Sequence, residues 1–433
     1  MTVDHRPLAV GHRPGTTSYR RVVGALFAAG MATFALLYST QAILPELSAT
    51  FGVSTGASTL TVSLTTLGLG VALLVAGPLS DVVGRTQLIH ASLAASGVVA
   101  AACALAPGWP ALLTLRLLLG VTLAGLPAVA TAYLREELHP SSHGRAAGLY
   151  IGGTALGGMA GRLVTGAVAE AAGWRWALAA TALLALLCAV VVRLLLPPSQ
   201  GFQPAPTGLL PLLDSARRAV SDPALLALYA VGACSVGALV AVFNTLTFRL
   251  EAAPYHLGLG AASLVFLVYP LGTASATWFG RLADTHGRRA VLPLGCLMAV
   301  TGGLLTLAQP LTAVVAGTGL LTAGFFAVHG VASGWVPVRA HAGGVASGQA
   351  ASLYLVAYYL GSSFFGSVAG YTWSSDGWTG VVTLATALLL ATGGLSLVLR
   401  RTPTLLVGPA HRPPSFATSQ SADSSTVVRG SSR

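Results

Sequence analysis

Long apolar stretches, each of roughly 20 residues, alternate with short polar segments along almost the whole chain. A helix of about 20 apolar residues can cross the hydrocarbon core of a bilayer, so the pattern predicts twelve membrane-spanning helices. Their centres fall near Phe34, Leu67, Gly97, Leu123, Leu156, Leu186, Val236, Pro270, Met298, Leu320, Leu360 and Leu388.

The composition agrees with lipid as the main solvent. Charged residues make up 8% of the chain, against about a quarter of a soluble domain, and the mean hydropathy is +0.76. The four cysteines lie inside apolar stretches without the spacing of metal ligands, so we expect no disulfide framework, no metal site and no cofactor.

The basic residues are unevenly distributed between the two sides of these stretches. All 23 are arginine, and 19 of them lie in the two termini and the even-numbered loops. Positive residues stay on the cytoplasmic side, so we expect a multi-pass protein of the cytoplasmic (inner) membrane with both termini in the cytoplasm. The net charge of +11 does not indicate nucleic acid, because no basic stripe with interleaved aromatic residues is present.

One loop sequence occurs twice, as GPLSDVVGRTQ from Gly77 and as GRLADTHGRRA from Gly280. A second set of matches, led by Leu149-Tyr150 and Leu353-Tyr354, repeats at nearly the same spacing. Two matches at one spacing indicate a duplicated chain. We therefore predict an all-α integral membrane fold of two pseudo-symmetric six-helix bundles.

These repeats also set the domain boundaries. We expect a cytoplasmic N-terminal tail (1–21), a first bundle (22–196), a cytoplasmic central loop (197–221), a second bundle (222–400) and a disordered cytoplasmic tail (401–433). Within the central loop, the stretch from Leu209 to Val220 is expected to form a short amphipathic helix at the membrane surface.

Each residue type in the repeated loop has a physical use. Glycine lets neighbouring helices approach closely or forms a tight turn, aspartate caps the next helix, and arginine supplies a charge partner. The loop serves either as a topology and capping device or as one of a matched pair of conformational latches. The latch residues are Gly77, Asp81, Gly84 and Arg85 in the first copy, and Gly280, Asp284, Gly287 and Arg288 in the second.

The loop pattern G-x-L-[AS]-D-x-x-G-R resembles the signature of the major facilitator superfamily of transporters. The resemblance implies that Asp81 helps to latch the halves in the outward-facing state, with Asp284 as its weaker twin. Val82 and Thr86 replace basic residues that are usual in this family, so we expect charge stabilisation of the loop to be better preserved in the second copy. The fifth-helix run Y-I-x-G-x-x-L-G-G-M-x-G-R from Tyr150 resembles the YnfM-type subgroup of inner-membrane transporters.

Two arginines inside predicted spans are the leading candidates for a solute site. Arg116 lies in the fourth span and Arg162 in the fifth, and a charge in the membrane costs several kcal/mol without a partner or cavity. Each either faces a cavity, where it contacts an anionic or carbonyl-rich solute or modulates protonation, or it snorkels outward or braces neighbouring helices. No acidic residue lies near the middle of a span, so a coupling proton would need Glu46 or Glu170, Asp81 or His329.

Other polar residues within spans are further cavity candidates. A spacing of 204 places Thr40 opposite Asn244, which indicates a site between the halves or a helix–helix hydrogen bond. His329 is either a proton carrier or a structural histidine. The remaining candidates, which line the cavity or lie at helix interfaces, are Tyr38, Gln41, Tyr150, Tyr354 and Tyr358.

No nucleotide-binding loop or catalytic motif is present, so the chain is not expected to be an enzyme or an ATP-driven pump. The prediction is a monomeric secondary transporter in the lipid bilayer that moves a small-molecule solute by alternating access. Proton-coupled efflux of a metabolite or drug is the first hypothesis, although the fifth span lacks the proline usual in exporters of this family. Uptake or symport of an organic anion or sugar, and a non-transporting membrane sensor, are the alternatives.

Overall fold

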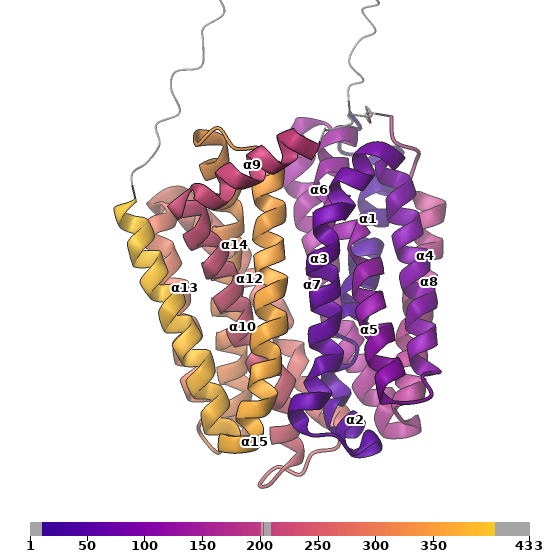
Figure 1. Cartoon of the computed structure of the whole chain (residues 1–433), viewed down its shortest axis with the longest axis vertical. Coiled ribbons are helices and arrows are strands. Elements are labelled where there is room, and N and C mark those ends of the chain that lie inside the picture. The colour runs from indigo at the N-terminus through magenta and orange to yellow at the C-terminus, as the bar shows by residue number, and fades with distance from the viewer. Residues whose placement is uncertain (1–10, 201, 203–208, 403–433) are drawn as a thin grey trace, which may run out of the picture.

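The computed structural model describes residues 11–200, 202 and 209–402, which form two helical bundles joined by a connecting helix (Figure 1). The first bundle consists of α1 (Thr17–Leu37), η1 (Gln41–Ile43), α2 (Leu44–Phe51), α3 (Thr55–Val83), α4 (Arg85–Ala104), α5 (Trp109–Leu123), α6 (Gly125–Glu137), η2 (Pro140–Ser142), α7 (His143–Ala172) and α8 (Trp174–Leu195). The second consists of α10 (Pro223–Glu251), α11 (Leu259–Ser263), η3 (Leu264–Val268), α12 (Tyr269–His286), α13 (Arg288–Leu305), α14 (Leu311–Ala342) and α15 (Ser347–Arg401).

Among the described residues, ten helical segments are long and apolar enough to cross a membrane. The glycine-rich helix α7 is not one of these ten, but its 30 residues are long enough to cross a membrane. Helix α15 bends at Gly377, which has φ 60° and ψ −150°, and therefore contributes two spans rather than one. The prediction of twelve spans in two six-helix bundles is confirmed.

The connecting helix α9 (Leu209–Ser221) crosses from one bundle to the other at the end of the molecule where the described chain begins and ends (Figure 1). We call this the terminal end and the opposite side the far end. Helix α9 occupies the stretch predicted to be helical, and α1 begins at Thr17, slightly before the predicted boundary. The expected tails lie mostly outside the described residues, which exclude 1–10 and 403–433.

Helix α1 stops short of the far end. Its last residue is Leu37, and a turn leads to the 3₁₀ segment η1 (Gln41–Ile43) before α2 continues the span. A helix that ends inside the membrane leaves backbone carbonyl groups without intrahelical partners, and these groups need donors from elsewhere in the protein.

The glycine stripe of α7 packs directly on the backbone of α1. A Cβ atom added at Gly153, Gly157 or Gly161 would collide with main-chain atoms of α1. Small residues at this spacing allow two helices to approach until their backbones touch. This contact fixes α7, and every side chain on it, relative to the interrupted helix α1.

The two bundles contact each other at the far end and separate toward the terminal end. Near the far end, Gly56 of α3 lies against Tyr371 and Gly370 of α15. At the terminal end, a Cβ atom added at Gly77 or Gly280 would meet no atom within 4 Å. The prediction that these two glycines permit close helix approach is wrong for this conformation, because the bundles are apart where the glycines lie.

Candidate functional site

Arg162 lies in the middle of α7 with a side chain that is only 1% exposed. Its Nε donates a hydrogen bond to Oε1 of Gln41 (2.6 Å), and one terminal nitrogen donates to the carbonyl of Gly158 (2.5 Å). No carboxylate among the described residues forms an ion pair with it. The guanidinium therefore has polar neighbours but no counter-charge within the described chain.

Aromatic rings enclose this guanidinium. Its carbon lies 4.3 Å from the ring centre of Tyr38 and 4.8 Å from that of Tyr269. Phe266 and Phe243 follow at 5.1 and 5.7 Å. Cation–π attraction partly replaces lost hydration, at about 2 kcal/mol or more for a desolvated pair. Tyr38 belongs to the first bundle and the other three rings to the second, so the rings place Arg162 at the interface between the bundles.

A chain of hydrogen bonds continues from Arg162 across the two halves. Nε2 of Gln41 donates to Oδ1 of Asn244 at 2.6 Å, and Nδ2 of Asn244 donates to the carbonyl of Gly366 at 3.2 Å. The partner of Asn244 is thus Gln41, 203 residues earlier, and not Thr40. All three polar side chains are buried. The structure therefore brings Arg162, Gln41 and Asn244 together at the centre of the molecule.

Arg116 has a different environment, although it is equally buried at 1% exposure. Its donors contact the carbonyls of Leu36 (3.3 Å) and Leu37 (3.1 Å), the hydroxyl of Ser39 (3.0 Å) and the carbonyl of Thr61 (2.8 Å). These acceptors all belong to the first bundle, and most lie where α1 breaks. The contacts match the bracing alternative, because Arg116 satisfies the carbonyl groups that the break exposes.

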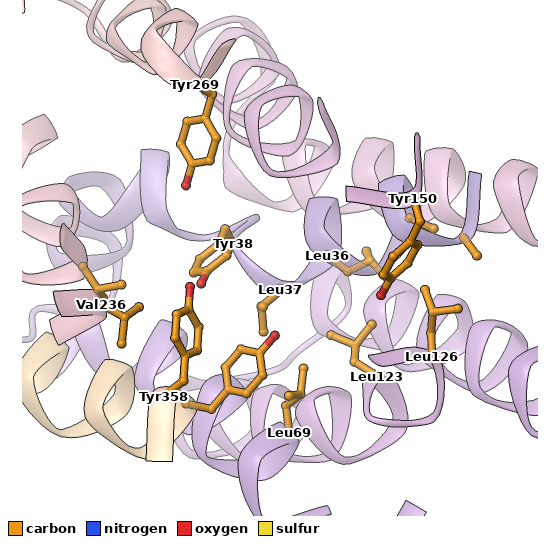
Figure 2. Packing of buried hydrophobic residues seen from close by; sticks show 14 of the residues in the cluster. Leu36, Leu37, Tyr38, Leu69, Leu123, Leu126, Tyr150, Val236, Tyr269 and Tyr358 are labelled. Atoms are coloured by element: carbon orange, nitrogen blue, oxygen red, sulfur yellow. The ribbon is translucent and has the colours of Figure 1, made fainter. Parts of the chain in front are cut away.

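The tyrosine candidates and His329 separate into two locations. Figure 2 shows the hydroxyls of Tyr38 and Tyr358 pointing toward one another, with Tyr269 directed at the same region. Tyr150 instead lies among Leu36, Leu123 and Leu126, within the first bundle (Figure 2).

His329 of α14 lies in the second bundle, beside Tyr358. Its Nδ1 is 2.9 Å from the hydroxyl of Tyr354, and its ring stacks on Phe325 with centres 5.7 Å apart. The ring centre of Tyr358 is 4.9 Å away. Tyr358 therefore links the His329 cluster to the rings around Arg162, whereas Tyr150 belongs to neither group.

The first latch loop forms a charged network within its own bundle. Helix α3 extends to Val83, so Asp81 lies inside the helix and pairs with Arg85 (2.6 Å), which also pairs with Glu136 of α6 (3.1 Å). The prediction that Asp81 caps the next helix is wrong, because Gly84 occupies the cap position without a side-chain bond. Its φ of 98° confirms the predicted tight turn.

The second latch loop has the same turn as the first, but among the described residues it lacks the ion pairs. Gly287 has a φ of 84°, whereas Asp284 is exposed and forms no ion pair with any residue the structure describes. The prediction that charge stabilisation is better preserved here is wrong. Arg339 of α14 has the same charge as Arg288 and pairs with Asp222 (2.9 Å).

Carboxylates lie at the far end, where the bundles meet. Oε2 of Glu170 accepts a hydrogen bond from the backbone N–H of Gly260 in the other bundle (2.5 Å). Oε1 of Glu46 accepts from the backbone N–H of Trp174 (2.8 Å), within the first bundle. Of these two acidic candidates, Glu170 is the one that bonds across the interface.

Sequence reasoning missed the three rings that the second bundle places around Arg162, and it missed Glu136. Aromatic residues are common in apolar spans, so Phe243, Phe266 and Tyr269 carried no signal of their own. Glu136 belongs to an acidic pair at the end of the fourth span, and only the folded contact shows that it reaches Arg85.

Comparison with known proteins agrees with this architecture. Residues 25–277 match the Major Facilitator Superfamily. The MFS-type transporter YybF of Bacillus subtilis (strain 168) is 39% identical over 389 residues, which are 90% of this chain and 96% of YybF. The inner membrane transport protein YnfM of Escherichia coli (strain K12) is 39% identical over 383 residues, 87% of this chain and 91% of YnfM.

Solved structures show the same fold. A bacterial homologue of the human lysosomal transporter Spinster, in its inward-facing and occupied conformation, superposes with a TM-score of 0.71 at 15% identity. The match covers 90% of this chain and 98% of that one. The resemblance to the superfamily and to YnfM is confirmed. The chain is therefore a multi-pass secondary transporter of the Major Facilitator Superfamily, a family of transporters rather than enzymes.

Proposed function

We propose that this transporter exports a small metabolite or drug bearing a carboxylate or carbonyl group, in exchange for protons. The environment of Arg162 carries the proposal. Its guanidinium is buried between the bundles, and no described carboxylate pairs with it. An unpaired charge in the membrane is costly, so an anionic or carbonyl group on the solute would be stabilised there.

The surrounding side chains suit the rest of such a solute. The rings of Tyr38, Tyr269, Phe243 and Phe266 offer apolar faces, and tyrosine hydroxyls offer hydrogen bonds. Because Gln41 bonds both to Arg162 and to Asn244, a solute that draws Arg162 away from Gln41 would also disturb the link between the bundles. Solute binding and bundle motion are coupled through this amide in our proposal.

The arrangement of the bundles supports an inward-facing state. They touch at the far end and separate at the terminal end, as an inward-facing carrier requires, and the Spinster homologue of the same fold was solved in inward-facing conformations. The arginine bias puts the terminal end in the cytoplasm. We therefore place both termini in the cytoplasm. In the outward-facing state, the Asp81 loop would latch the closed terminal end.

The coupling proton is assigned to Glu170. Its carboxylate bonds to Gly260 of the other bundle, and a charged acceptor makes a stronger hydrogen bond than a neutral one. Protonation from outside would weaken this contact and favour opening of the far end. His329 is the alternative carrier, although its Nδ1 already contacts Tyr354.

The test uses purified protein in liposomes with an imposed pH gradient and a panel of labelled carboxylates, sugars and hydrophobic cations. We expect solute flux coupled to proton movement for a carboxylate or carbonyl compound. Arg162→Gln should abolish binding and flux of that compound, and Arg162→Lys should weaken both. The control is Arg193→Gln, which changes an exposed arginine at the end of α8 and should alter neither binding nor flux. Unchanged binding in folded Arg162→Gln protein would refute the site.

The same experiment separates the alternatives. Solute entry driven by protons moving in the same direction would identify uptake of an organic anion, which Arg162 suits equally well. Binding without flux would identify a sensor. Glu170→Gln should remove the pH dependence of transport while leaving solute binding intact. If the pH dependence persists, Glu170 is not the proton carrier.

A further inference from the structure

A groove runs between α1 and α7 at the terminal end, away from the Arg162 site. It has a volume of about 340 Å³ and mostly apolar walls. Its lining includes Tyr19, Arg20, Val23 and Phe27 of α1, and Arg145 and Leu149 of α7. Leu149 is 40% exposed, so the groove opens on the surface of the spans. An apolar channel that opens in the membrane matches the shape and chemistry of an acyl chain.

Two arginines flank this groove. Arg20 lies in the first turn of α1 and Arg145 in the first turn of α7, so both occupy the same membrane level. Both are exposed, and neither side chain forms a hydrogen bond or ion pair with a residue in the described part of the chain. Arg85, by contrast, is held by Asp81 and Glu136. The groove therefore carries two uncommitted positive charges.

Tyr19, whose side chain is part of the groove wall, is buried. Tyr19 is 6% exposed, and its hydroxyl has no hydrogen-bond partner among the described residues. The hydroxyl is therefore enclosed by protein, and the polar groups that a phosphate at this end of the groove would meet are the two arginines.

We propose that this groove is a binding site for an anionic phospholipid of the inner leaflet. The phosphate lies between Arg20 and Arg145, and one acyl chain follows Val23, Phe27 and Leu149 into the membrane. Basic pockets between spanning helices at the cytoplasmic surface recognise anionic head groups in this way. The bound lipid clamps α1 against α7, the two helices that lead to Gln41 and Arg162. The inference does not depend on which solute is carried.

Native mass spectrometry of the purified full-length protein tests the site, with phosphatidylglycerol and phosphatidylethanolamine of identical acyl chains as probes. We expect phosphatidylglycerol to bind preferentially and to raise the melting temperature by mass action. Near a membrane surface each arginine contributes about 1 kcal/mol, so Arg20→Gln/Arg145→Gln should weaken phosphatidylglycerol binding about 30-fold. The matched control is Arg217→Gln/Arg281→Gln, which removes two exposed arginines outside the groove and should change little.

Further arms distinguish a lipid from a free anion. Glycerol 3-phosphate, which has the phosphate without the chains, should neither bind measurably nor stabilise the protein. Leu149→Gln, which makes the wall of the groove polar, should weaken lipid binding while leaving both arginines in place. The proposal would be overturned if the two lipids bound equally well, or if both double variants lost phosphatidylglycerol binding to the same extent. It would also be overturned if glycerol 3-phosphate stabilised the protein as much as phosphatidylglycerol does.

Discussion

Enlarging Gly77 should trap the transporter in the conformation described here. A Cβ at this position meets no atom within 4 Å, so a methyl group fits without a clash while the terminal end is open. Alanine in a helix interior is more favourable than glycine by about 1 kcal/mol, so Gly77→Ala and Gly77→Leu should fold at least as stably as the wild type. Alternating access requires the terminal end to close, which would bring Gly77 against the other bundle.

The size of the effect follows from packing. Adding atoms to a closely packed contact costs about 1–3 kcal/mol, which would shift the balance between the two states about 5- to 150-fold toward the open terminal end. Leucine should have a larger effect than alanine. Solute flux in liposomes should fall in the same order, whereas binding from the terminal side should persist.

Distance measurements between spin labels can follow this shift. Labels at the exposed positions Ser141 and His341, in a cysteine-free background, report the separation of the bundles at the terminal end. Gly303→Leu is the matched control, because its Cβ also meets nothing within 4 Å but lies in α13. Wild-type flux in Gly77→Leu, or a distance distribution that matches the control, would refute the reasoning.

Two further predictions concern stability. Arg116→Gln removes the guanidinium that donates to the buried carbonyls of Leu36, Leu37 and Thr61, so the unfolding free energy should fall by about 3 kcal/mol. Chemical denaturation checks this, and an unchanged midpoint would argue against the brace. Gly157→Ala places a Cβ 2.6 Å from the Cα of Met31, and such overpacking should cost about 1–3 kcal/mol. Gly148→Ala, which meets nothing within 4 Å, should melt at or above the wild-type temperature.

Much of the fold could be predicted from the sequence because lipid imposes simple rules. Span length, the arginine bias and the repeated loop gave the twelve helices and the two halves. The glycine spacing of the fifth span likewise reflects a physical need, since the backbone of α1 lies where side chains would otherwise be. These features depend on local pattern alone.

The site was harder to predict because its geometry depends on where helices break and meet. Nothing in the local sequence shows that α1 ends at Leu37, and without that break the role of Arg116 as a donor to α1 cannot be foreseen. The rings around Arg162 come mainly from the other half of the chain. The repeat spacing also matters to one residue: a spacing of 204 pairs Asn244 with Thr40, whereas the observed partner, Gln41, lies 203 residues before it.

The bond between Gln41 and Asn244 has a consequence for the origin of the chain. The two residues hold equivalent places in the two repeats, and in a homodimer with twofold symmetry a residue on the axis meets its own copy. An ancestral six-helix unit could therefore have paired with itself through this one polar position. The present halves differ beside this bond: Gln41 accepts from the side chain of Arg162, whereas Asn244 donates to the backbone carbonyl of Gly366, the residue 204 positions after Arg162.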